Sequence, residues 1–112
     1  MFIIKKMSDY LTIRDMQKQV DDWIKDNKGY WNPLSIYAQV GEESGELARV
    51  LNNLYGGRVK KLDEPEKRIG EEISDLMFAL VCLANSHNID LEESWRETIA
   101  RRCERDKNRY KK

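Results

Sequence analysis

The chain has 112 residues, and its 20 Lys and Arg balance 20 Asp and Glu, so the formal net charge is zero. This length suits one domain, and the neutral balance gives no indication of non-specific nucleic-acid binding. Only 6 Gly and 2 Pro leave little turn-forming capacity, which argues against an all-β fold. One histidine and two cysteines nearly exclude a Cys/His zinc site, and the thiols favour a reducing, cytoplasmic location.

The two ends of the chain are predicted to lie outside the folded domain. The apolar stretch at residues 1–4 is too short for a membrane span or a signal peptide, so we expect no membrane association. We interpret residues 1–8 as an N-terminal leader that need not be ordered, and Met7 is an alternative start. Residues 9–109 form one helical domain and residues 110–112 a basic tail.

Four helices are predicted from the hydrophobic periodicity and from the capping residues. Their expected spans, in chain order, are residues 13–28, 33–55, 65–86 and 91–108. Thr12 and Asp90 are the predicted N-caps of the first and fourth helices, because a side-chain oxygen there can accept a bond from the first helical turn. Glu93, three residues after Asp90, is the expected partner in a capping box.

The third helix is apolar on every face from residue 76 to residue 84. A helix of this kind is buried on all sides, which one small chain cannot readily provide. We place Ile73, Leu76 and Leu80 on the intramolecular contact line, and expect a second chain to cover Phe78 and Cys82. The predicted fold class is therefore all-α, an antiparallel helical bundle of about four helices completed by oligomerisation as a homodimer or a dimer of dimers. A deep core helix in a monomer is the alternative.

Two pairs of acidic residues share the same i, i+3 spacing, namely Glu43 with Glu46 and Glu72 with Asp75. Residues three apart are neighbours on one helical face, so each pair can direct two carboxylates at one point. All four border the apolar stripes of two helices that should pack antiparallel. Clustered carboxylates favour a bound cation, and oxygen ligands suit Mg²⁺ or Mn²⁺. The alternative is that these are solvated faces of a charge-rich chain.

The order of these motifs resembles that of the MazG-type all-α nucleoside triphosphate pyrophosphohydrolases, in their short single-domain form. The similarity covers residues 13–109 and includes Glu-Glu-Ser-Gly-Glu-Leu-Ala at 42–48, Glu-Glu-Ile-Ser-Asp-Leu at 71–76 and Leu-Ala-Asn at 83–85. It implies Mg²⁺-dependent hydrolysis of an NTP or dNTP to the monophosphate and pyrophosphate, for the removal of non-standard or surplus nucleotides. The metal ligands that it implies are Glu43, Glu46, Glu72 and Asp75.

Together with this resemblance, the sequence offers candidates for the catalytic base and for substrate binding. Glu46 and Glu42 are candidates for the catalytic carboxylate that activates water. Arg101 and Arg105 stand where the family often has a basic pair with Lys first, and their charge suits the phosphates. Asn85 resembles a position near the substrate, and Trp31 could stack on a base or anchor the core.

Two rival functions fit parts of this pattern. A non-catalytic helical oligomer could use its acidic cluster to bind a metal or a protein partner. A di-iron bundle would need a Glu-x-x-His motif, but Ala84 stands three residues before His87. Base, sugar and the number of metal ions per site stay open.

Overall fold

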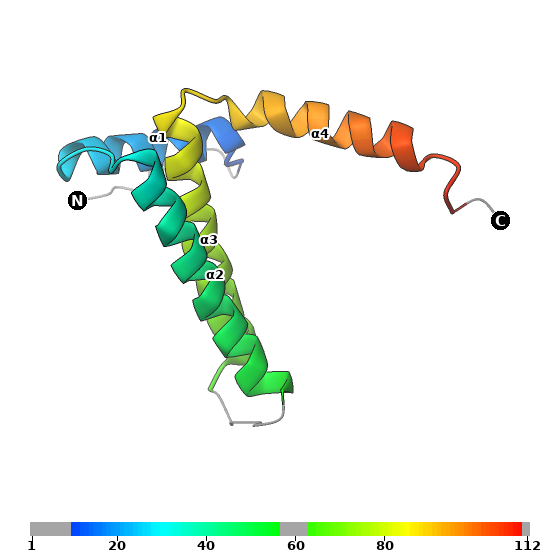
Figure 1. Cartoon of the computed structure of the whole chain (residues 1–112), viewed down its shortest axis with the longest axis horizontal. Helices are drawn as coiled ribbons and strands as arrows, with labels where there is room; N and C mark the ends of the chain where they lie inside the picture. Colours follow the sequence, from blue (N-terminus) through cyan, green and yellow to red (C-terminus); the bar gives the residue numbers. More distant parts are fainter. Residues whose placement is uncertain (1–9, 57–62, 111–112) are drawn as a thin grey trace.

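The computed structural model describes residues 10–56 and 63–110. This part of the chain forms four helices and contains no strand, in agreement with the predicted all-α class: α1 (Ile13–Asp26), α2 (Pro33–Tyr55), α3 (Pro65–Ser86) and α4 (Leu91–Asp106). α2 and α3 lie side by side as an antiparallel hairpin, α1 crosses one end of it, and α4 leads away as an arm (Figure 1). The predicted leader and residues 111–112 lie outside the described residues.

The helices begin at the residues that the sequence indicated. The Thr12 hydroxyl accepts a bond from the Asp15 backbone, and the Asp15 carboxylate accepts one from the Thr12 backbone, both at 3.0 Å, which closes a capping box. Asp90 caps α4 by accepting bonds from the first-turn backbone. The Glu93 carboxylate lies 3.9 Å from Arg96 instead, so a simple N-cap replaces the expected box.

The core lies where α1 crosses the α2–α3 hairpin. Its buried members are Val20, Ile36, Val81 and Cys82. The prediction of which α3 face is left open was wrong for Cys82, which the same chain buries, whereas Phe78 stays 39% exposed although α1 packs against its ring. Cys82 is 8% exposed, and the Phe78 ring packs edge-on against Trp23 with 5.9 Å between ring centroids. Ile73 and Leu80, which we expected to be covered, are 43% and 44% exposed.

Large apolar side chains are exposed on all four helices of the described fold, and those on α3 and α4 bear on the predicted contact between chains. The outer face of α3 exposes Ile73, Met77 and Leu80, while α4 has no buried residue and exposes Trp95 and Ile99. The radius of gyration is 17.4 Å, whereas a compact domain of this length has about 13 Å. The accessible surface is 9503 Å², against about 6,500 Å² for a compact monomer of this mass. A single chain is therefore an open shape rather than a closed bundle.

Both cysteines are free thiols, as predicted, with Cys82 buried and Cys103 exposed. Burial raises the pKa of the Cys82 thiol. Within residues 10–56 and 63–110, no helix combines the length and the apolar character that a bilayer crossing requires.

A hydrogen-bond network ties α1 to the C-terminal end of α3. The Asn85 side chain accepts a bond from the Gln17 side chain (2.8 Å) and donates to the Gln17 carbonyl (2.9 Å) and to the Tyr30 hydroxyl (3.0 Å). Tyr30 donates in turn to Asp21 at 2.7 Å. Burial, followed by the bond to Asp21, raises the pKa of Tyr30 to about 12. The network fixes the loop of residues 27–32, which leads into α2.

Tyr30→Phe should lower the free energy of unfolding by about 1–2 kcal/mol at pH 7, because Asp21 and Asn85 each lose a partner. The folded-state pKa lies above the unfolded value of 10.0, so the neutral hydroxyl stabilises the fold fully below pH 10 and loses this effect as the pH rises towards 12. Urea denaturation should show the wild-type advantage shrinking over that range. Tyr37→Phe, at a side chain that is 62% exposed, is the control. An advantage that stays constant up to pH 12 would contradict the role of this hydroxyl.

Candidate functional site

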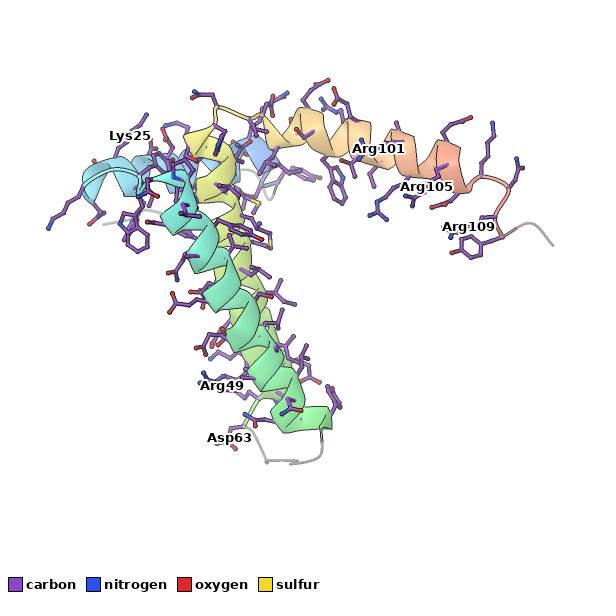
Figure 2. The ribbon with its side chains drawn as sticks, viewed as in Figure 1. Lys25, Arg49, Asp63, Arg101, Arg105 and Arg109 are labelled. Carbon is purple, nitrogen blue, oxygen red and sulfur yellow. The ribbon has the colours of Figure 1, made fainter. Side chains whose placement is uncertain are left out.

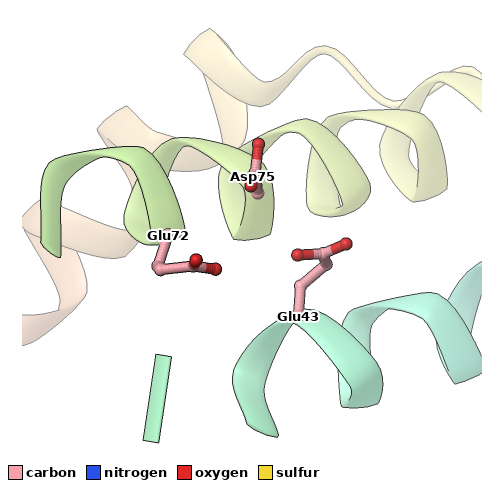
Figure 3. A group of neighbouring side chains, drawn as sticks. All are labelled: Glu43, Glu72 and Asp75. Carbon is pink, nitrogen blue, oxygen red and sulfur yellow. The ribbon is translucent and has the colours of Figure 1, made fainter. Parts of the chain in front are cut away.

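Three of the predicted metal ligands converge where α2 and α3 run side by side. Glu43 lies on α2, Glu72 and Asp75 lie on neighbouring turns of α3, and the three side chains point toward one another (Figure 3). One carboxylate oxygen from each lies within 4.8 Å of the others. The i, i+3 spacing on α3 and the antiparallel packing of α2 produce this arrangement. We call Glu43, Glu72 and Asp75 the acidic triad.

The donor set of the acidic triad fits a hard divalent cation. Two oxygens that bind one Mg²⁺ at about 2.1 Å lie roughly 3 to 4 Å apart, so small side-chain adjustments suffice to close the site. Glu43 and Glu72 are half-buried and Asp75 is exposed, which leaves room for water or a ligand on one side. Oxygen ligands alone favour Mg²⁺ or Mn²⁺ over zinc. Their role as metal ligands stays a prediction.

The remaining acidic candidates lie beside the triad on α2. The Glu46 carboxylate, predicted as the fourth ligand, lies 3.5 Å from the Arg49 guanidinium and outside the group of converging oxygens. Glu42, the other candidate base, is exposed. The structure thus brings three of the five acidic candidates together and keeps the other two within one helical turn of Glu43.

An apolar pocket of about 360 Å³ adjoins the acidic triad, between α1, the loop of residues 27–32, α2 and α3. Glu43 and Asp75 belong to its wall, so the pocket and the triad share a border. Trp31, predicted to bind substrate, lines the pocket together with Trp23 and Tyr30. Its volume and its aromatic lining are typical of a site for a small flat ligand.

Asn85 does not line this pocket, although it was predicted to bind substrate. It borders a separate polar depression together with Gln17 and Asp21. Both the oxygen and the nitrogen of its side-chain amide are bonded to Gln17 or Tyr30. In this conformation Asn85 anchors the loop that carries Trp31.

The basic candidates Arg101 and Arg105 lie on α4, the arm that leads away from the hairpin (Figure 2). α4 makes its main helix contact with α1. The Arg105 guanidinium donates two bonds to Asp106, at 3.1 and 3.0 Å, and this contact raises the pKa of Arg105. Arg101 is exposed. The structure does not bring either guanidinium to the acidic triad of the same chain.

Two polar residues of the pocket wall, Asn27 and Gln39, were missed by the sequence analysis. The Gln39 side-chain amide donates a bond to a Glu43 carboxylate oxygen at 2.8 Å. Its i, i+4 spacing from Glu43 is the signal that could have identified it. The Asn27 amide nitrogen, at the end of α1, donates to the Trp23 carbonyl at 2.8 Å.

The chain is similar to proteins of one family. Residues 32–110 match the MazG nucleotide pyrophosphohydrolase domain. The uncharacterized protein YpjD of Bacillus subtilis (strain 168) is 47% identical over 105 residues, which cover 93% of this chain and 94% of that protein. The crystal structure of YpjD from Bacillus subtilis, described as a candidate pyrophosphatase, matches with a TM-score of 0.76 at 45% identity, over 82% of this chain and 95% of that chain. The crystal structure of the Bacillus-conserved MazG protein, a nucleotide pyrophosphohydrolase, matches with a TM-score of 0.72 at 41% identity, over 83% and 90% of the two chains.

Glu72→Gln and Asp75→Asn should each weaken Mn²⁺ binding by about tenfold or more, because each removes one negative charge from the acidic triad. Without metal, both variants should be at least as stable as the wild type, since repulsion within the triad falls. Calorimetric titration and thermal denaturation measure the two effects. Glu71→Gln, the same change at an exposed neighbour outside the triad, is the matched control. Wild-type Mn²⁺ affinity in both triad variants would exclude this site.

Proposed function

Because the chain belongs to the MazG nucleotide pyrophosphohydrolase family, we propose that it hydrolyses an NTP or a dNTP to the monophosphate and pyrophosphate. The observation that carries this proposal is the convergence of the acidic triad at the border of an aromatic-lined pocket. A nucleotide has a part suited to each region. Its flat, weakly polar base suits the pocket, and its phosphates suit a cation held by the carboxylates.

Mg²⁺, with Mn²⁺ as a substitute, is the cofactor that we propose. A triphosphate with about four negative charges is repelled by three bare carboxylates, so a cation must lie between them. When bound, Mg²⁺ would neutralise part of the phosphate charge and favour attack at phosphorus. The acidic triad would hold this ion, and Glu46, one turn after Glu43 on α2, is the proposed fourth ligand.

Water attack on the α-phosphorus requires a proton acceptor, for which Glu46 and Glu42 are the candidates. A carboxylate near the triad but outside it can take a proton from water, and both residues stand in this position on α2. In the proposed reaction the water oxygen bonds to the α-phosphorus, its proton passes to the carboxylate, and the bond between the α-phosphorus and the bridging oxygen breaks. Pyrophosphate leaves with that oxygen.

Trp31 is the residue that we propose to stack on the base. It is 63% exposed at the wall of the pocket, so its ring has a free surface to offer. Stacking on an aromatic face tolerates several bases, because every base has such a face. Asn85 would support the base site through Tyr30 and the loop, and not by direct contact.

We also propose that the active unit is a homodimer or a dimer of dimers. A second copy would cover the exposed faces of α3 and α4, which carry Ile73, Leu80 and Trp95. The charges are complementary, because residues 101–109 hold five Arg and Lys against two acids, while the hairpin carries the acidic triad. Arg101 and Arg105 would bind phosphates at the site of another copy, because the arm holds them away from the triad of their own chain.

Removal of non-standard or surplus nucleotides in the cytoplasm is the role that we propose, and the two free thiols agree with a reducing compartment. The rival function, a non-catalytic oligomer that binds a metal or a partner protein, predicts metal binding without turnover. A panel of nucleotides therefore separates the two.

At micromolar concentration the wild type should scatter light as a multiple of its 13.3 kDa chain mass. Leu80→Glu should reduce that mass, because a charge would be buried at the contact between copies. Lys67→Glu, an exposed change in the first turn of α3, is the control, and circular dichroism confirms that both variants keep their helices. Wild-type particles of 13.3 kDa alone would contradict self-association.

Hydrolysis of NTPs and dNTPs with Mg²⁺ in ¹⁸O water should yield pyrophosphate and a monophosphate that carries the label. Arg105→Ala should slow triphosphate turnover at least about tenfold, since the charge on the leaving pyrophosphate loses a partner. Its Mn²⁺ affinity without nucleotide should stay at the wild-type value. Chromatography and mass spectrometry identify the products. Labelled orthophosphate released together with a nucleoside diphosphate would show attack at the terminal phosphate and overturn the proposal.

A further inference from the structure

We infer that Gln39 is a positioning residue that links the apolar pocket to the acidic triad. Gln39 belongs to both regions, because the residue lines the pocket and its side-chain amide donates a bond to a Glu43 oxygen at 2.8 Å. The inference rests on the proposed function for the identity of the pocket ligand as a nucleotide. The effect of Gln39 on metal affinity can be measured without nucleotide and does not depend on the proposed activity.

The chemistry of the contact fixes how the Gln39 amide is oriented. An ionised carboxylate only accepts hydrogen bonds, so the group that faces Glu43 is the amide nitrogen and not the amide oxygen. The carbonyl oxygen of Gln39 is therefore turned away from Glu43. In the described part of the chain, neither this oxygen nor the second N–H has another hydrogen-bond partner. One acceptor and one donor thus remain for a molecule in the pocket.

Two other polar side chains of the pocket wall have hydrogen-bond partners in their own surroundings. The Tyr30 hydroxyl is bonded to Asp21 and Asn85, and the Asn27 amide nitrogen is bonded to the Trp23 carbonyl. The amides of Gln39 and Asn27 thus each keep a carbonyl oxygen and a second N–H, but Gln39 is the one whose bonded partner is a carboxylate of the acidic triad. A neighbouring acceptor and donor match the donor–acceptor edge of a nucleobase, which glutamine binds through two bonds.

On the side of the triad, the bond from Gln39 restrains Glu43. The glutamate side chain has several rotatable bonds, so α2 alone does not fix the position of its carboxylate. A donor one turn earlier on the same helix holds one oxygen and partly offsets the repulsion from Glu72 and Asp75. Outer bonds of this kind to ligating carboxylates typically change metal affinity by about 10- to 100-fold.

Gln39→Met keeps the length of the side chain and removes both hydrogen-bonding groups. We expect its dissociation constant for Mn²⁺, titrated without nucleotide, to rise about tenfold. Gln19→Met is the matched control, because Gln19 lies on α1 outside the pocket. Gln39→Asn keeps the amide but is one methylene too short to reach Glu43, so it should reproduce the loss if the Met variant is poorly folded.

Steady-state kinetics supply a second readout. If Gln39 contacts the base, the ratios of kcat/KM among dATP, dGTP, dCTP and dTTP should differ between Gln39→Met and the wild type by more than about threefold. The inference would be overturned if folded Gln39→Met and Gln39→Asn bound Mn²⁺ within twofold of the wild-type affinity. The hydrogen bond from Gln39 to Glu43 would then only stabilise α2. A tenfold loss of Mn²⁺ affinity in a protein that hydrolyses no nucleotide would support the positioning of Glu43 while refuting the proposed function.

Discussion

Repulsion among three carboxylates at the α2–α3 contact is the constraint around which the rest of this site is arranged. At 4.8 Å, the largest separation of the converging oxygens, two unit charges repel by about 1 kcal/mol in water and by about 3.5 kcal/mol near a protein surface, and the exposure of Asp75 favours the lower value. Burial of an aliphatic side chain contributes about 1.5–3 kcal/mol, and Ile36, Val50 and Ala79 are each 4% exposed on the same two helices. Apolar packing between α2 and α3 thus keeps the carboxylates of the acidic triad close together, and a bound cation would offset their repulsion.

The pocket depends on how α1 crosses this hairpin. Trp23 meets Phe78 edge-on, and two large rings in this arrangement form a wall without filling the space beside the triad. The loop of residues 27–32 closes another side and is held by the bonds of Tyr30 to Asp21 and Asn85. A polar network on one side therefore maintains an apolar pocket on the other, and the pocket can stay open without being part of the tightly packed core.

The sequence predicted what depends on local interactions. Thr12 and Asp90 mark their helix ends because each cap involves residues at most three positions apart. The triad was predictable because Glu72 and Asp75 share a face of α3, and only the register of α2 had to place Glu43 opposite them. The face of α3 that stays exposed was not predictable in this way, because it depends on where α1 packs against the hairpin. The ion pair that turns Glu46 towards Arg49 depends on a choice among side-chain rotamers, which periodicity does not encode.

The direction of α4 follows from its attachment to α1. The Arg14 guanidinium binds Asp90 at 2.8 Å and Glu92 at 2.7 Å, at the start of the arm. The bond from Arg14 lowers the pKa of Asp90, so the pair stays ionised at neutral pH. This anchor directs the cationic end of α4, which includes Arg101 and Arg105, away from the acidic triad of its own chain (Figure 2). In the proposed homodimer or dimer of dimers, these charges could meet between molecules, and the exposed apolar faces of α3 and α4 would supply the contact area.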